Sequence, residues 1–160
     1  MHEIAPRVWV GSQADFMTLG EDADGWAFVH ACKEPHHRQA LGYAGRAAPK
    51  DHPEYLMAIR NHRIMLNIVD VDDPAYIRAE IIDAALAHMR TAVLDGLSVL
   101  CHCNEGKSRG PTIGMLYLAP SLPEDFDEAE QVYTTLVPDY APRNGVRQFA
   151  RDNWEKYRTT

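Results

Sequence analysis

The chain has 160 residues, 46% of them hydrophobic and 24% charged, and its formal net charge is -7 at pH 7. This composition is close to the globular average, which excludes a disordered or fibrous protein, and the length suits one domain with its own core. The acidic balance argues against a broad nucleic-acid-binding face, because such a face needs many Lys and Arg side chains to neutralise phosphates. We therefore expect a single domain over residues 1–160 and no nucleic-acid partner.

The sequence also predicts no membrane contact. No run approaches the roughly 18 apolar residues that a membrane-spanning helix needs, and the N-terminal segment lacks the apolar core of a signal peptide. The chain has three cysteines, an odd number that makes a poor disulfide framework and leaves at least one thiol free. A cytoplasmic location is the expectation, and the sequence predicts no oligomeric state.

Four short runs rich in β-branched and aromatic residues indicate strands. They are "RVWVG" (7–11), "WAFVHAC" (26–32), "RIMLNIVDV" (63–71) and "SVLCH" (98–102).

Helical patterns alternate with these runs. Residues 74–96 carry apolar side chains at helical spacing, with Pro74 suited to the first turn and Gly96 to the C-terminal cap. The expected buried face is Ile77, Ile81, Ala85, Met89 and Val93. Further helices are predicted over 110–118, 125–137 and 144–157. Asp125, with Glu128 in a capping box, and Asn144 are the expected N-caps.

This alternation predicts an α/β fold with a mostly parallel sheet of about four or five strands and helices on both faces. Ligands of such sheets bind beyond the carboxyl ends of the strands, and "SVLCH" carries Cys103 to that edge.

The stretch "HCNEGKSR", residues 102–109, joins a predicted strand to a predicted helix. A tight loop at a helix N-terminus directs backbone N–H groups inward and forms a nest for one phosphate-sized anion. The same groups stabilise a thiolate on Cys103, which makes it a nucleophile, and Arg109 can bind two phosphate oxygens with its planar guanidinium. Gly106 allows a backbone with positive φ. The predicted phosphate-binding residues are Asn104, Glu105, Gly106, Lys107, Ser108 and Arg109.

His102, Cys103, Gly106, Ser108 and Arg109 match the H-C-x-x-G-x-S-R core of the cysteine-based protein tyrosine phosphatases, and the chain resembles their dual-specificity branch. Weaker similarities are found in "EIAPRVWVGSQADF", "LNIVDVDDP", "DEAEQVY" and "APRNGVRQF", so that the resemblance covers most of the chain outside residues 33–62.

The resemblance implies a two-step hydrolysis. Cys103 attacks phosphorus to form a phosphocysteine, an aspartic acid protonates the leaving oxygen, and water then releases phosphate without a metal or cofactor. Asp70 is the preferred acid because it follows "LNIV", 33 residues before Cys103; Asp72 and Asp73 are the alternatives. The implied substrate is a phosphorylated protein or a small phosphomonoester. A phosphoinositide, an inositol phosphate or an RNA 5'-phosphate is the alternative.

Gly110 departs from the family pattern, which usually has Ser or Thr directly after the arginine. The missing hydroxyl would stabilise the departing thiolate, so we expect slow phosphocysteine hydrolysis, which a hydroxyl restored at position 110 should accelerate. Ser108 or Thr112 could substitute for it. A phosphate-binding pseudophosphatase is the corresponding alternative.

The other cysteines have less specific interpretations. Cys101 points to the same strand face as Cys103 and is expected in the core. Cys32 lies in "FVHACKEPHHR", which is similar to a stretch of phosphoinositide phosphatases, and this similarity implies a reversible Cys32–Cys103 disulfide; core packing is the alternative. A zinc site of His30, Cys32, Cys101 and Cys103 is a weaker interpretation, because the usual ligand spacing is missing.

Residues 33–62 are basic within an acidic chain. The segment is either a solvated surface excursion or a rim that recruits an anionic substrate. Its cations are Lys33, Arg38, Arg46, Lys50 and Arg60, against Glu34, Asp51 and Glu54.

Overall fold

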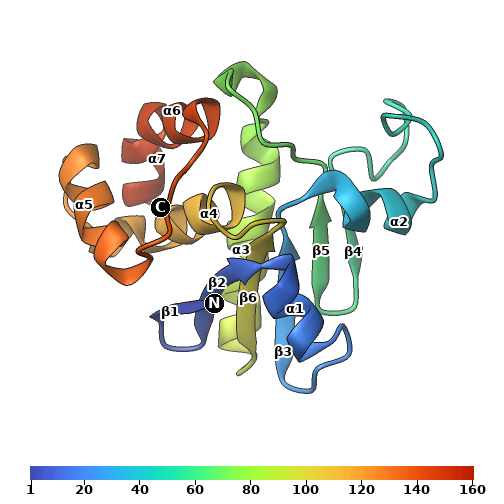
Figure 1. Cartoon of the computed structure of the whole chain (residues 1–160), viewed down its shortest axis with the longest axis horizontal. Helices are drawn as coiled ribbons and strands as arrows, with labels where there is room; N and C mark the ends of the chain where they lie inside the picture. Colours follow the sequence, from blue (N-terminus) through green and yellow to red (C-terminus); the bar gives the residue numbers. More distant parts are fainter.

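The four predicted strands form the parallel centre of a six-stranded sheet (Figure 1). The computed structural model describes residues 1–160, and its strands follow the order β1-β2-β6-β3-β5-β4. The central strands β2, β6, β3 and β5 are parallel, and one antiparallel strand closes each edge. The bounds are β1 His2–Ala5, β2 Val8–Ser12, β3 Trp26–His30, β4 Met57–Arg60, β5 Arg63–Leu66 and β6 Ser98–Cys103. The predicted α/β fold is therefore confirmed, with two edge strands added.

The helices lie on both faces of the sheet, as expected. Their bounds are α1 Gln13–Leu19, α2 Arg38–Leu41, α3 Ala79–Leu94, α4 Arg109–Leu118, α5 Phe126–Leu136, α6 Asn144–Asp152 and α7 Trp154–Arg158. Short helical turns occupy Lys33–His37, Pro74–Tyr76 and Ala119–Ser121. None of these helices combines the length and apolar character that crossing a lipid bilayer requires.

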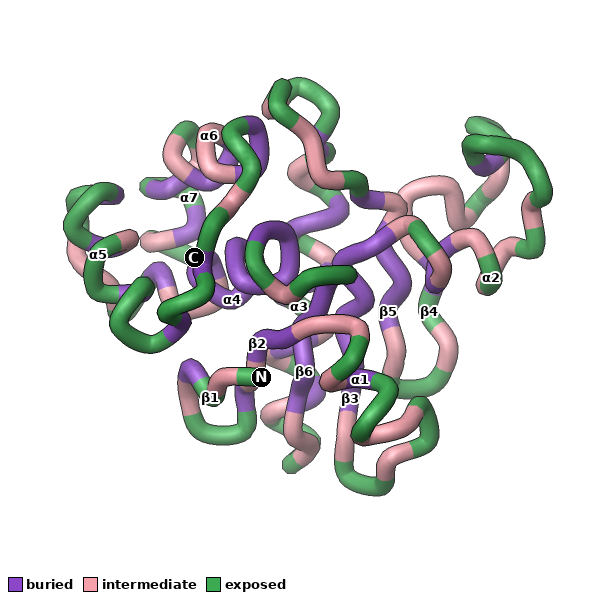
Figure 2. Tube along the Cα trace, in the orientation of Figure 1, coloured by how far each residue is buried: buried purple, intermediate pink, exposed green.

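The pleat of β6 separates two cores. Val99, Cys101 and Cys103 join the large core under α3 and α4, whereas Leu100 packs with Phe16 of α1 on the other face. Because successive strand side chains point to opposite faces, one strand supplies both layers. In Figure 2 the trace is largely coloured as buried along the central strands.

The predicted helix over 74–96 begins later than expected. Pro74 starts a separate turn that Asp73 caps by accepting a hydrogen bond from the N–H of Ala75. Ile77 and the following residue are extended, and Ile77 reaches the core from that conformation. Gly96 follows the helix with φ of 82°, in agreement with its predicted capping role.

The two predicted N-caps have different outcomes. Asp125 accepts a hydrogen bond from the N–H of Glu128 and caps α5 as expected. Asn144 as an N-cap was wrong, because it is the first residue of α6 and the preceding Arg143 makes no side-chain cap. The helix 144–157 also breaks at Asn153 into α6 and α7. The first N–H groups of α6 are instead used by loops of the candidate site.

Candidate active site

Cys103 is the last residue of β6, and Arg109 is the first residue of α4. The Cys103 side chain is nearly buried, with 2% of the residue exposed. No N–H group in the connecting loop, residues 104–108, donates a hydrogen bond to a backbone carbonyl. Free N–H groups at a helix N-terminus form an anion-binding site, so this loop has the polarity that a phosphate requires.

Gly106 sets the close packing of this loop. Its φ is +74°, and a Cβ at this position would lie 2.8 Å from the carbonyl carbon of Gly11 and 2.8 Å from the nitrogen of Ser12. The loop therefore rests directly on the junction between β2 and α1, where the N–H of Gln13 donates to the carbonyl of Asn104. Only glycine meets both the conformational and the steric requirement.

Arg109 is held by the loop and by the segment that follows β5. Its Nη2 donates to Oδ1 of Asn104 at 2.8 Å, and its Nη1 donates to the carbonyl of Ile68 at 3.4 Å. Arg109 is 9% exposed as a residue, and its buried Nε has no protein partner. A fixed guanidinium with a free buried donor is suited to bind an oxyanion at the loop.

Of the three candidate acids, Asp70 alone contacts the loop. Its Oδ1 accepts a hydrogen bond from the Ser108 hydroxyl at 2.7 Å. Asp72 is largely exposed and pairs with Arg143 at 3.2 Å, while Asp73 caps the turn at residues 74–76. The geometry therefore favours Asp70.

The N-terminus of α6 supports the loop after β5 that carries Asp70, Asp72 and Asp73, called the acid loop below. This contact was not predicted from the sequence. Ser108 Oγ accepts from the N–H of Arg143 at 3.0 Å, and the N–H of Gly145 donates to the carbonyl of Val71 at 3.1 Å. A Cβ at Gly145 would lie 2.7 Å from that carbonyl oxygen and 2.6 Å from the carbonyl carbon of Asp72. The similarity of the stretch "APRNGVRQF" to the family was the only sequence signal for this region, and it did not indicate which segment α6 contacts.

The packing around Gly110 explains its departure from the family pattern. A Cβ there would lie 2.9 Å from the carbonyl carbon of His102 and 3.0 Å from the nitrogen of Cys103. A serine therefore does not fit without moving Cys103. This removes the basis for expecting that a hydroxyl at position 110 would accelerate phosphocysteine hydrolysis. Neither proposed substitute is bonded to the sulfur: Ser108 bonds Asp70, and Thr112 bonds the hydroxyl of Tyr140.

All three cysteines are free and buried. Cys101 belongs to the large core, as predicted. Burial raises the pKa of Cys32 to about 12 and holds the pKa of Cys101 well above its usual value, so both stay protonated at neutral pH. The zinc site with His30 was wrong, because His30 lies on the α1 face against Phe16, across the sheet from the core that contains Cys101 and Cys103. The Cys32–Cys103 disulfide stays a prediction.

Part of the basic segment lies against the loop. The amide of Asn104 donates to the carbonyl of Glu34 at 3.0 Å, while residues 42–56 project past the β4 edge (Figure 1). Two of its cations are paired within the segment, Arg38 with Glu34 and Arg60 with Glu54, each at 2.6 Å. This pairing weakens the interpretation of the segment as a cationic rim.

No protein-family model and no curated protein matches the sequence. Several solved structures resemble it over nearly the whole chain. DUSP15 has a TM-score of 0.65 at 17% identity, covering 99% of this chain and 92% of that one. Human DUSP28 has a TM-score of 0.61 at 20% identity, covering 99% and 96%. The human tyrosine phosphatase-like serine/threonine/tyrosine-interacting protein has a TM-score of 0.63 at 14% identity, covering 98% and 97%.

These likenesses show that the chain has the fold of the dual-specificity phosphatases, as the motif at residues 102–109 led us to expect. The third of these structures has the same fold, and its name calls it a phosphatase-like, interacting protein. The fold alone therefore does not separate catalysis from binding. The assignment of activity therefore depends on the geometry around Cys103.

Proposed function

We propose that the protein is a cysteine-dependent phosphomonoester hydrolase that works through a phosphocysteine intermediate. The observation that carries the proposal is the position of Cys103 at the start of a loop with free N–H groups, closed by the buried Arg109. We further propose the cytoplasm as its compartment, because three free thiols suit a reducing environment.

In the first step, the Cys103 thiolate forms a bond to phosphorus as the bond from phosphorus to the leaving oxygen breaks. Asp70 gives its proton to that oxygen, and the loop N–H groups with Arg109 stabilise the charge on the equatorial oxygens. The Ser108 hydroxyl, which donates to Asp70, sets the orientation of the carboxyl group.

In the second step, water attacks the phosphocysteine and the sulfur–phosphorus bond breaks. Asp70, now a carboxylate, accepts the water proton, and Cys103 leaves as a thiolate. Gly110 has no hydroxyl, and the hydroxyls of Ser108 and Thr112 are hydrogen-bonded to Asp70 and Tyr140 rather than to the Cys103 sulfur. We therefore expect this step to limit turnover.

For the substrate we favour a phosphorylated protein, with phosphotyrosine as the main side chain and phosphoserine and phosphothreonine as further substrates. A phosphoinositide, an inositol phosphate or an RNA 5'-phosphate would need a strongly cationic rim, and Arg38 and Arg60 are already neutralised by Glu34 and Glu54.

A phosphate-binding module without turnover is the second candidate function, and Gly110 is the observation that favours it. If the missing hydroxyl at this position marks lost catalysis, the N–H groups of the loop and Arg109 bind the phosphate of a phosphorylated partner and Cys103 does not attack it.

Rapid mixing with para-nitrophenyl phosphate tests both candidates. We expect wild type to release one equivalent of nitrophenolate in a burst and then turn over slowly. Cys103→Ser should abolish both phases, and the matched control Cys32→Ala should keep both. Absence of both burst and turnover in wild type, with a phosphopeptide still bound, would support the binding module. A burst that persists in Cys103→Ser would overturn the assignment of the nucleophile.

A further inference from the structure

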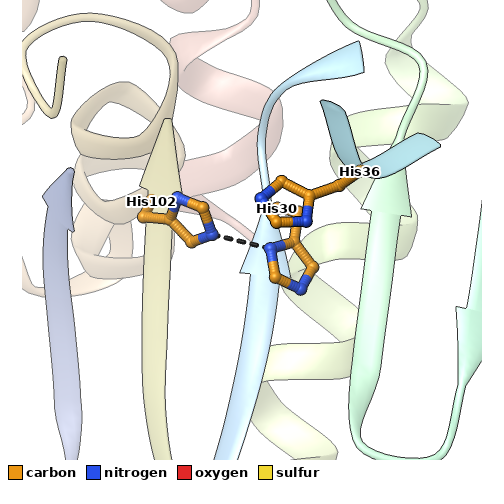
Figure 3. Close-up of side chains that lie close together, drawn as sticks. All are labelled: His30, His36 and His102. Atoms are coloured by element: carbon orange, nitrogen blue, oxygen red, sulfur yellow. Dashed lines mark hydrogen bonds between the residues drawn. The ribbon is translucent and has the colours of Figure 1, made fainter. Parts of the chain in front are cut away.

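Three histidines converge beside Phe16 of α1, on the face of the sheet opposite the Cys103 side chain. Figure 3 shows their rings close together. The loop of residues 104–108 is called the phosphate loop below. His30 comes from β3, His102 from β6, and His36 from the turn that leads into α2. The register pairs His30 with His102 across adjacent strands, so the two rings meet, with Nδ1 of His30 2.6 Å from Nε2 of His102.

His36 adds a third imidazole from a separate segment. Its ring stacks on His30 with 3.8 Å between the ring centroids, and its Nε2 lies 2.7 Å from Oε1 of Gln13. One possible ligand atom from each histidine lies within 4.8 Å of the others. All three residues are at most 8% exposed, and Phe16 packs against each ring.

Hydrogen bonding accounts for only part of this cluster, namely the contacts from His30 to His102 and from His36 to Gln13. Nε2 of His30 and Nδ1 of His102 are buried without a partner, although buried polar atoms in proteins are nearly always paired. Two adjacent imidazoles that serve packing alone would be replaced at lower cost by apolar side chains. The convergence of three rings therefore calls for a ligand that unites them.

The chemistry of the three side chains fits a transition-metal cation. Zinc prefers four tetrahedral ligands with Zn–N bonds of about 2.0–2.1 Å, which places ligand nitrogens roughly 3.3 Å apart. The closest pair, Nδ1 of His30 and Nε2 of His102, is 2.6 Å apart, so these two rings would have to separate to reach this spacing.

The cluster also has access to solvent. A pocket of about 330 Å³ opens beside it, with His36, Gln13 and Phe16 in its wall. The amide oxygen of Gln13 or a water molecule can fill the fourth position. Arg60 and Arg63 also line the pocket, but each is paired with a carboxylate, of Glu54 and Glu21 respectively, which offsets their charge toward a cation.

We propose that His30, His36 and His102 bind a divalent transition-metal ion, best matched by Zn²⁺, at a site separate from the phosphate loop. Three neutral imidazoles with an open fourth position are typical ligands for zinc, and no thiolate takes part. The ion would join β3, β6 and the turn before α2, and so fix the strand that ends in Cys103. This inference is independent of the proposed function.

Metal titration of the tag-free full chain, stripped with EDTA, tests the proposal. We expect one equivalent of Zn²⁺ to bind in competition with a chromophoric chelator and to raise the melting temperature. Co²⁺ should give the visible d–d bands of a tetrahedral nitrogen site without a thiolate-to-cobalt charge-transfer band. Loss of an outer partner typically weakens metal binding about 10- to 100-fold, so loss of a ligand in His36→Ala or His30→Phe should weaken it at least as much.

Two controls make the result decisive. His52→Ala, which removes a histidine in another part of the chain, should bind zinc as wild type does, and Cys103→Ser should do the same. Binding that survives His36→Ala but is lost in Cys103→Ser would place the metal on the thiol and overturn the proposal, as would the absence of stoichiometric binding. If His30→Phe fails to fold, His36→Ala decides alone, because His36 lies at the pocket wall.

Discussion

Three glycines of the candidate site allow backbone segments to meet where a side chain would separate them. Gly106 contacts the junction of β2 and α1, Gly110 contacts the end of β6, and Gly145 contacts the acid loop. At each position an added Cβ would lie 3.0 Å or less from backbone atoms of the neighbouring segment. Backbone yields less readily than a flexible side chain, so the geometry around Cys103 depends on the absence of these three Cβ atoms.

Gly110→Ser should damage the enzyme. The new Cβ would press on the nitrogen of Cys103, and overpacking of this kind costs about 1–3 kcal/mol of the free energy of unfolding. We expect a lower urea midpoint and a slower burst with para-nitrophenyl phosphate. Gly110→Ala, which adds the Cβ without the hydroxyl, is the matched control and should behave similarly. A faster second phase in Gly110→Ser alone would show that the loop can accommodate the side chain.

Asp70→Asn should lower kcat by about 10²- to 10⁴-fold, because a positioned proton donor typically supplies that much. The loss in kcat/KM, which reports the first step, should be larger for phenyl phosphate than for para-nitrophenyl phosphate, since the poorer leaving group needs the proton more. Steady-state kinetics with both substrates measures the difference. Asp72→Asn is the control, because Asp72 is exposed and bonded to Arg143. Equal losses for the two aspartates would argue against Asp70 as the acid.

Part of the site could be predicted from the sequence and part could not. The spacing of Cys103 and Arg109 within one strand–loop–helix unit is a local pattern, and so its geometry follows from few residues. The contact between Asp70 and Ser108 joins residues 38 positions apart, and that between Ser108 and Arg143 joins residues 35 apart. Hydroxyl and amide groups have no distinctive partner in a sequence, so these contacts appear only once the chain is folded.

At the scale of elements, α6 acts as the support of the acid loop. Its second residue, Gly145, donates to the carbonyl of Val71, and Arg143 just before the helix donates to Ser108. These bonds use the N–H groups that the first turn of a helix leaves free. The loop that carries Asp70 is thereby fixed from outside the sheet.

Gly145→Ala should displace this loop. A misplacement of about 1 Å can cost up to roughly 10²-fold in rate, so we expect kcat to fall by about 10- to 100-fold. Because the effect acts through Asp70, it should nearly vanish in the Asp70→Asn background, as a double-mutant cycle would measure. Gly45→Ala is the control, since the atom nearest to its new Cβ, the carbonyl oxygen of Ala47, would be 3.9 Å away. Fully additive losses would mean that Gly145 acts elsewhere.

The elements differ in how well their sequences predicted them. The four central strands are nearly continuous apolar runs because both of their faces are buried, and that pattern is strong. Strands β1 and β4 have four residues each and lie at the edges, so they carry no such pattern. The break before α3 depends on the Asp73 cap and on the extended Ile77, which side-chain periodicity does not report.

At the scale of the whole molecule, buried tyrosines link stability to alkaline pH. Tyr133 and Tyr140 pack edge to face, and burial raises the pKa of each above its usual value. The folded state therefore keeps protons that the unfolded chain loses above about pH 10, so stability is complete below that pH and falls as the pH rises.

The free energy of unfolding should decrease by about 1.4 kcal/mol per pH unit for each of these tyrosines above roughly pH 10. Urea unfolding at pH 8, 10 and 11 measures the slope, and the tyrosinate absorbance should rise together with unfolding. Tyr133→Phe should reduce the slope, although it also removes the hydrogen bond to the carbonyl of Pro111 and lowers stability at neutral pH. A slope unchanged in Tyr133→Phe would assign the alkaline sensitivity to other groups.

The pleat of β6 has a consequence for how this chain can vary. Neighbouring positions on one strand serve unrelated chemistry, the thiol of Cys103 on one side and the imidazole of His102 on the other. A substitution on either side is screened from the other by the backbone between them. An insertion or deletion of one residue upstream in β6 would instead exchange the two sides and abolish both at once. We expect this strand to tolerate changes of side chain far better than changes of length.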